Sequence, residues 1–249
     1  KAALPISLGA AVATVMSLID SIMVPERMLK AGFSVSESAV LYGQLTGKAL
    51  TLSNVPLALS VALCASLVPI ISEAYSTNKT FELNRRIEMA FKLSFVIALP
   101  CTVGLYSLAA PIMHLVFVKD VGGYNILKLA ATTVPFIVIT QTTTALLQSV
   151  GDYLRPVYNL AAGCVVKVII SYLLIPITAI NIYGAVIGTL CGYIVTVILN
   201  MFQIKKVFSV KLNIYEILLK PAMASLIMLI FVVFTYNNVY NYTISNGIS

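Results

Sequence analysis

The chain has 249 residues, of which 59% are hydrophobic and 10% are charged, and its mean hydropathy is +0.97. A soluble globular domain carries charge on about a quarter of its residues, so this composition excludes that class and indicates a membrane protein. The net charge of +7 fits attraction to anionic lipids, and nothing further in the sequence supports a nucleic-acid partner.

Seven apolar stretches are predicted to cross the bilayer as helices. A helix needs about 20 mostly apolar residues to span about 30 Å of hydrocarbon, and this length holds about seven such spans with short connections. The fold class predicted from them is all-α, a polytopic transmembrane helix bundle. The first apolar run lacks the basic segment and cleavage site of a signal peptide. The predicted spans are 3–24, 45–72, 90–111, 127–149, 157–178, 183–204 and 215–236.

Basic residues are distributed unevenly between alternate connections, and this distribution predicts the orientation of the chain. We expect the chain start and the segment 73–92 to be cytoplasmic, the latter as a charged loop, and the Asn- and Tyr-rich chain end to be extracytoplasmic. The connections after the second, fourth and sixth spans contain Lys79, Arg85, Arg86, Arg155, Lys205, Lys206 and Lys211, whereas those after the first, third and fifth contain Arg27, Lys30 and Lys119.

Lys167 is the strongest candidate for a functional residue, because a charge near the centre of a span is costly unless it faces a cavity or a partner. Asn159, Gly163 and Lys167 recur every four residues and therefore share one face of their helix. One interpretation is that this face borders a substrate cavity. The other is that the lysine pairs with an acid or a carbonyl group of a neighbouring helix for assembly.

Three further charged residues, Asp20, Arg27 and Lys48, are expected at the outer side, where the first span ends and the second begins. Interfacial anchoring explains each of them. Lys48 also belongs to a stripe at helical spacing, and the first span carries a comparable stripe of small residues. Close helix packing and a cavity wall are both consistent with such stripes, which are Gln44, Lys48, Thr51, Val55, Ala58 and Ala62 in the second span and Ser7, Ala10, Thr14, Ser17 and Ser21 in the first.

The sequence predicts neither a metal nor a cofactor. Its cysteines, Cys64, Cys101, Cys164 and Cys191, fall inside predicted spans without a ligand pattern, and its single histidine is His114. An enzyme needs an acidic pair, a metal site or a His-based nucleophile in a loop large enough to hold a substrate. No such set is present, so we do not expect an enzyme. In the fourth span, Gln141 and Gln148 share a face that either lines a polar path or cross-links helices.

Sequence motifs in the second half of the chain resemble those of a known transporter superfamily. The run LLQSVGDYLRPVYNLAAGCVVKVIISYLLIP contains the pattern Q-x2-G-x4-P-x2-N-x3-G-x3-K, and YGAVIGTLCGYIVTVILN follows it. They resemble paired helices in the C-terminal half of polysaccharide exporters of the multidrug/oligosaccharidyl-lipid/polysaccharide (MOP) superfamily. The segments LYGQLTGKAL and ASLVPIISEA resemble, more specifically, the stage V sporulation protein B group.

This resemblance implies a flippase for polyprenyl-diphosphate-linked sugars, such as the lipid-linked precursor of peptidoglycan, in cell-wall or spore-cortex synthesis. Its members have two six-helix lobes around a central cavity that opens alternately to each side. Residues 1–204 then correspond to the C-terminal, MATE-like lobe, and residues 205–249 to an additional span with an outer tail. The N-terminal lobe is expected as a partner absent from this chain.

The same resemblance implies a basic cavity that binds the diphosphate, where Arg27 and Lys48 occupy similar positions and Lys48 replaces an arginine common in relatives. The expected partners are the lipid-linked sugar, the bilayer and cell-wall synthesis enzymes. We expect substrate-binding roles for Lys167, Lys48, Arg27, Gln44, Asn159 and Gln148, and a coupling role for Asp20.

Two alternatives remain open at this point. The first is a drug or cation antiporter on the same fold, which would need a deep acid for proton or sodium coupling. Apart from Asp20, the acidic residues lie in or beside the predicted loops. The second is a non-transporting membrane scaffold for cell-wall or sporulation enzymes.

Overall fold

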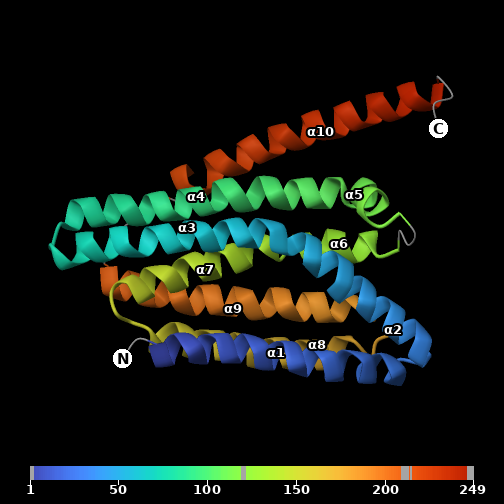
Figure 1. Cartoon of the computed structure of the whole chain (residues 1–249), viewed down its shortest axis with the longest axis horizontal. Coiled ribbons are helices and arrows are strands. Elements are labelled where there is room, and N and C mark those ends of the chain that lie inside the picture. The colour runs from blue at the N-terminus through green and yellow to red at the C-terminus, as the bar shows by residue number, and fades with distance from the viewer. Residues whose placement is uncertain (1–2, 119–121, 209–212, 214, 246–249) are drawn as a thin grey trace.

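The computed structural model describes residues 3–118, 122–208, 213 and 215–245, with the backbone alone for residues 3–8, 10, 237 and 239–245. Over these residues the chain forms helices joined by short connections and contains no strand (Figure 1). The α-helices are α1 Ala3–Lys30, α2 Val35–Gly43, α3 Leu50–Ser76, α4 Thr80–Ser107, α5 Ala109–Val116, α6 Tyr124–Ala131, α7 Val134–Ser149, α8 Leu154–Leu174, α9 Tyr183–Phe208 and α10 Lys220–Ser245, and the π-helices are η1 Gln44–Ala49 and η2 Tyr215–Leu219.

Six helical stretches of the described chain are long and apolar enough to cross a membrane. They correspond to the second through seventh predicted spans, and the predicted all-α membrane bundle is confirmed. The first predicted span is α1, a helix of 28 residues that lies along α8 (Figure 1). The six stretches are Val35–Ser76, Thr80–Ser107, Tyr124–Ser149, Leu154–Leu174, Tyr183–Phe208 and Tyr215–Tyr236.

The predicted loop at 73–92 is wrong, because the chain turns within residues 77–79 and is helical on both sides. Asn78 has a φ of 53°, a left-handed conformation that asparagine tolerates. The following charges belong to the first turns of α4, where Arg86 and Glu82 form an ion pair four residues apart. A helix of 28 residues is about 42 Å long. It therefore exceeds the hydrocarbon thickness and carries its charges beyond it.

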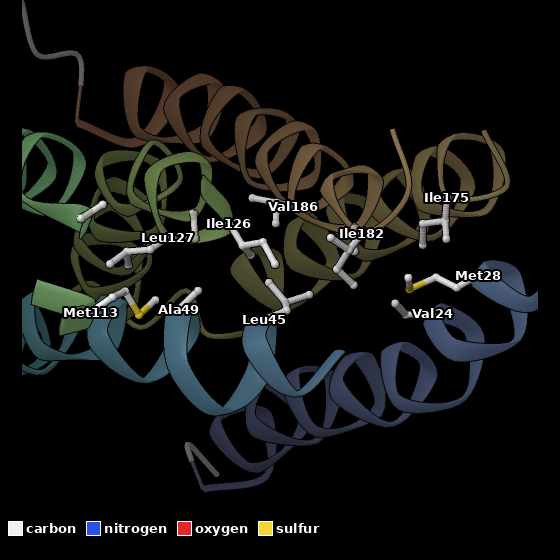
Figure 2. Packing of buried hydrophobic residues seen from close by; sticks show 13 residues of the cluster. Val24, Met28, Leu45, Ala49, Met113, Ile126, Leu127, Ile175, Ile182 and Val186 are labelled. Carbon is white, nitrogen blue, oxygen red and sulfur yellow. The ribbon is translucent and has the colours of Figure 1, made fainter. Parts of the chain in front are cut away.

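Two apolar clusters hold the helices together toward opposite ends of the bundle. The first joins α1, η1, α5, α6 and α9 (Figure 2), where Met28, Leu127 and Ile182 are fully buried. The second joins α3, α4, α7 and α9 around Ile87, Leu147 and Ile204, which are also fully buried. A third, smaller cluster of Ala98, Val134 and Val138 joins α4 to α7.

The backbones of α8 and α9 lie in close contact, because glycines face the contact on both helices. A Cβ atom added at Gly163 would lie 2.5 Å from the carbonyl oxygen of Gly192, and one added at Gly188 would lie 2.9 Å from that of Lys167. Small residues allow this approach of membrane helices. The sequence therefore fixes how α8 is rotated relative to α9, and with it the position of Lys167.

Helix α10 packs against α4 and diverges from the rest of the bundle (Figure 1). Its outward side chains Ile230, Phe231 and Phe234 are 68%, 67% and 67% exposed, as expected for a helix that faces lipid or another membrane segment. The expected outer tail is helical through Ser245, and residues 246–249 lie outside the described residues. The division of the chain at residue 204 stays a prediction.

The orientation predicted from the basic residues can be tested on the two ends of the bundle. Figure 1 shows the α3–α4 and α7–α8 connections at the same end as the start of α1. In a cysteine-free background, Lys79→Cys should react with a membrane-impermeant maleimide from the cytoplasmic side alone, whereas Ala179→Cys, in the α8–α9 connection, should react in intact cells. The opposite labelling pattern would reverse the predicted orientation.

Gly188→Val should weaken the α8–α9 contact, because its side chain would meet Ser171 Oγ and the backbone of Lys167. We expect the free energy of unfolding to fall by about 1–3 kcal/mol or more, the usual cost of overpacking. The loss of helical circular dichroism on heating in detergent measures it. Gly43→Ala is the control, since a Cβ atom at Gly43 would have no neighbour within 4 Å. Equal transition midpoints for the two variants would contradict the assigned contact.

Candidate functional site

A pocket with a volume of about 360 Å³ lies among α1, α3, α7, α8 and α9 and the η1 segment. Its lining combines apolar side chains with an unusual number of polar ones for a membrane bundle. It is the region in which two predicted site residues, Asp20 and Lys167, come together. Its polar lining is Ser17, Asp20, Tyr42, Thr46, Ser53, Asn54, Thr133, Gln141, Lys167, Thr189 and Tyr193.

Lys167 and Asp20 form an ion pair at this pocket, in which Lys167 Nζ donates to Asp20 Oδ2 at 2.5 Å. The lysine side chain is 7% exposed and the aspartate side chain is 23% exposed. Asp20 was expected near the outer end of the first span, and that placement is wrong. Helix α1 continues to Lys30, so Asp20 lies deep enough to meet Lys167. Lys167 therefore pairs with an acid of a neighbouring helix and also borders a pocket. Its role with a substrate stays a prediction.

The close contact of α8 and α9 puts the Lys167 side chain into the pocket. A Cβ atom added at Gly192 would lie 3.0 Å from the Cβ of Lys167, so the lysine stem passes directly over this glycine. A lysine without a partner would be costly at this depth. Asp20 supplies that partner from α1.

Three buried polar atoms of the pocket lack a hydrogen-bond partner among the described residues: Asp20 Oδ1, Ser53 Oγ and Gln141 Oε1. They come from α1, α3 and α7 and line the same space. Leaving a buried polar group unsatisfied costs about 1–3 kcal/mol, so a water or ligand that bonded to these atoms would gain stability. Ser53 was absent from the sequence-based set. Its signal was weak, because a serine in a membrane span usually packs or bonds to its own helix.

Asn159 and Gln148 do not line this pocket. Asn159 Nδ2 donates to Asn200 Oδ1 at 2.7 Å, and Asn200 Nδ2 donates to Thr143 Oγ1 at 3.0 Å. This buried network cross-links α7, α8 and α9. Gln148 is half-buried near the end of α7. The structure thus gives Asn159 contacts that hold helices together without a substrate.

Arg27, Lys48 and Gln44 also lie outside the pocket lining. The Arg27 guanidinium carbon is 3.1 Å from the centroid of the Tyr172 ring, which joins α1 to α8. Lys48 Nζ donates to the Gly122 carbonyl at 3.3 Å and lies 5.4 Å from the centroid of the Phe117 ring. A Cβ atom at Gly123 would lie 3.0 Å from that of Gln44, so Gln44 packs against this turn. Their substrate-binding roles stay predictions.

The stripe predicted for the second span begins in the π-helix η1 and does not form the pocket wall. The bonds of this π-helix run from residue i to i+5 rather than i+4, as for the Leu50 N–H that donates to the Leu45 carbonyl. The extra residue rotates the following helix. Pocket-lining positions are Leu45, Thr46, Leu50, Ser53, Asn54 and Leu57, whereas Thr51, Val55, Ala58 and Ala62 of the predicted stripe are exposed.

The described residues contain no group of three or more His, Cys, Asp or Glu side chains that could hold a metal ion. The cysteines Cys64, Cys101, Cys164 and Cys191 are free thiols within helices. The chemistry available at the pocket is therefore that of an ion pair, hydroxyl groups and amides, which bind and orient a molecule.

The chain matches a known family of membrane proteins. Residues 34–246, most of the chain, match the model of the family described as lipid II flippase MurJ. The chain belongs to this family. The resemblance to MOP-superfamily flippases noted in the sequence is confirmed, and the MurJ-family chain is a multi-pass membrane protein related to transporters.

Three relatives of this MurJ-family chain come from Bacillus subtilis (strain 168). Stage V sporulation protein B is 25% identical over 197 residues, which cover 79% of this chain and 38% of the relative. Lipid II flippase MurJ is 24% identical over 215 residues, which cover 84% of this chain and 38% of the relative. Sporulation protein YkvU is 24% identical over 196 residues, which cover 79% of this chain and 44% of the relative. The chain therefore spans less than half the length of each of these relatives.

A solved structure shares the fold of this MurJ-family chain. It is a multidrug resistance MATE family transporter of the MOP superfamily in an outward-facing conformation. The TM-score is 0.69 at 17% identity, over 94% of this chain and 53% of that chain. This similarity shows a MATE-like fold for the described helices.

The ion pair at the pocket should be visible in the stability of charge variants. Lys167→Met leaves the partly buried Asp20 carboxylate without a cation. We expect it to lower the free energy of unfolding by about 3 kcal/mol, the low end for breaking a buried pair, because Asp20 is 23% exposed. Asp20→Asn combined with Lys167→Met should recover most of this loss in a thermal or denaturant titration. A double variant no more stable than Lys167→Met would contradict direct pairing.

Proposed function

We propose that this chain is the C-terminal part of a flippase that moves a polyprenyl-diphosphate-linked sugar, a peptidoglycan precursor or polysaccharide repeat unit, across the bacterial cytoplasmic membrane. The observation that carries the proposal is the polar pocket with the Lys167–Asp20 pair, enclosed by membrane helices of a chain from the lipid II flippase MurJ family. A purely structural bundle has little use for such a pocket.

A hydrated polar path is the physical requirement of this transport. The head group of the lipid carries charge and many hydroxyl groups, and an unpaired ion in a low-dielectric interior costs several kcal/mol even after relaxation. The polyprenyl tail can remain in lipid while the head group passes through a cavity. Nothing has to be made or broken covalently, so the proposed mechanism is alternating access of one lobe against another.

The second lobe is part of this proposal. The chain covers 53% of the MATE transporter whose fold it shares and 38% of the MurJ and stage V relatives. We assign residues 1–204 to the C-terminal lobe and residues 205–249 to an additional span, with an N-terminal lobe as the partner that completes the cavity. Cell-wall synthesis enzymes are the further partners that such a substrate implies.

Within the proposed cavity, Asp20 contacts the head group, and Lys167 acts through it by holding the carboxylate in place. The coupling role expected for Asp20 stays a prediction, which its pairing with Lys167 disfavours. Arg27 and Lys48 keep their proposed role with the diphosphate at the outer part of the cavity. Gln44, Asn159 and Gln148 are weaker candidates, because the pocket is lined by other residues.

An antiporter on the same fold is the second candidate function, and one observation favours it. Asp20 is a deep acid that lines the pocket, which a drug or cation antiporter needs for coupling. The pairing of this acid with Lys167 argues against it, since the ammonium group already supplies the positive charge that a coupling cation would bring.

Transbilayer movement in proteoliposomes tests the proposed function. The full-length protein should accelerate the movement of a labelled polyprenyl-diphosphate sugar, and Asp20→Asn combined with Lys167→Met should slow it at least about tenfold, as expected for losing one charge-assisted hydrogen bond. Gly43→Ala serves as the control, because a Cβ atom at Gly43 would have no neighbour within 4 Å. Drug efflux without lipid movement would support the antiporter, and movement of neither would support the scaffold.

A further inference from the structure

The pocket combines unpartnered hydrogen-bond acceptors with neutral donors, among them Tyr42, Asn54 and Tyr193. Asp20 Oδ1 and Gln141 Oε1 are buried acceptors without a partner among the described residues. Three threonine hydroxyls of the lining already donate into their own helices: Thr46 to the Tyr42 carbonyl at 2.8 Å, Thr133 to Ala130 at 2.7 Å and Thr189 to Ala185 at 2.9 Å. A hydroxyl has one proton and two lone pairs, so these threonines have acceptor capacity left for a ligand.

A diphosphate is a poor match for this set of atoms. Phosphate oxygens need donors, preferably charged ones, and the positive charge of Lys167 is already balanced by the Asp20 carboxylate. A phosphate placed near Asp20 Oδ1 would also face a carboxylate oxygen. A second cation is equally disfavoured, because the lysine ammonium already balances the carboxylate.

A neutral group that carries hydroxyl and amide protons does match. Its donors can bond to Asp20 Oδ1 and Gln141 Oε1, and Ser53, which is 3% exposed with an unpartnered hydroxyl, can donate or accept. Tyr42 and Tyr193 add aromatic surface to the lining. The volume of about 360 Å³ is within the range of about 300–1,000 Å³ for small-molecule sites.

We propose that this pocket is a subsite for the sugar of the transported lipid and not for its diphosphate. The inference rests on the proposed function and specifies which part of the substrate these helices recognise. In this arrangement Asp20 and Gln141 accept from sugar hydroxyl or acetamido groups, and the Ser53 hydroxyl completes the contact from α3. Lys167 is a positioning residue, which fixes the carboxylate through Oδ2 and leaves Oδ1 for the sugar.

Binding of two lipids that differ by the sugar tests the inference. The probes are a polyprenyl diphosphate carrying one N-acetylhexosamine and the same polyprenyl diphosphate without it, each titrated into full-length protein in detergent. Gln141→Met and Ser53→Ala should each raise the Kd for the sugar lipid about three- to tenfold, the usual range for one hydrogen bond, and leave the Kd for the sugar-free lipid unchanged. Ser60→Ala is the control, a fully buried serine on the same helix outside the pocket lining.

The outcomes separate this inference from the proposed function. An unchanged ratio of the two Kd values in both pocket variants, or an equal weakening of both lipids, would overturn the sugar subsite while leaving the flippase in place. Failure of the unmodified protein to bind either lipid would overturn the proposed function, and the inference with it. Thermal transitions like that of the unmodified protein show that the two conservative variants are folded.

Discussion

The buried ion pair between Lys167 and Asp20 is the interaction on which the rest of the site depends. An unpaired lysine within a membrane span is costly, and an unpaired aspartate is equally so. Two further contacts join the same helices, the Arg27 guanidinium over the Tyr172 ring and the Thr178 hydroxyl that donates to the Ala31 carbonyl at 3.2 Å. The ion pair therefore aligns α1 with α8 at the depth where the pocket forms.

The ion pair depends in turn on the glycine contacts between α8 and α9. One face of α8 presents Asn159, Gly163 and Lys167 in successive turns, and each has a different task. Asn159 enters the hydrogen-bond network with Asn200, Gly163 allows the backbones to meet, and Lys167 passes over Gly192 into the pocket. Packing and polar function therefore share a single helix face, and a change in the rotation of α8 would disturb all three contacts at once.

The length of the apolar stretches was sufficient to predict the membrane helices, because a span is a local property of about 20 residues. It placed α8 and α9 within a few residues of their observed bounds. It failed at 73–92, because charge marks the membrane boundary and not the end of a helix, and α4 continues through Arg86 into that charged region. The face of Lys167 was likewise predictable, because Asn159, Gly163 and Lys167 recur every four residues.

The pocket itself was only partly predictable, because it is assembled from helices far apart in the sequence. Lys167 was identified from its depth, but its partner was misplaced since the end of α1 was set too early. The lining of α3 was missed for another reason. The pocket-lining residues Thr46, Leu50, Ser53 and Leu57 recur at helical spacing and form a different face from the stripe that includes Lys48. The sequence of this helix alone does not show which of the two faces meets the other helices.

Internal charge compensation also suits a site that must be empty for part of each transport cycle. A cavity that relied on a free ammonium group would leave an unpaired charge in the membrane whenever the substrate departed, and that state would be strongly destabilised. Here the lysine keeps its carboxylate partner, and the substrate adds hydrogen bonds worth about 0.5–1.5 kcal/mol net each, or about 1.5–3 kcal/mol for the bond to the carboxylate. Several such bonds hold a sugar selectively, yet none is strong enough to prevent its release. The same balance requires that the charge of the lipid be met elsewhere, toward the outer end of the bundle where Arg27 and Lys48 lie or on the surface of the other lobe.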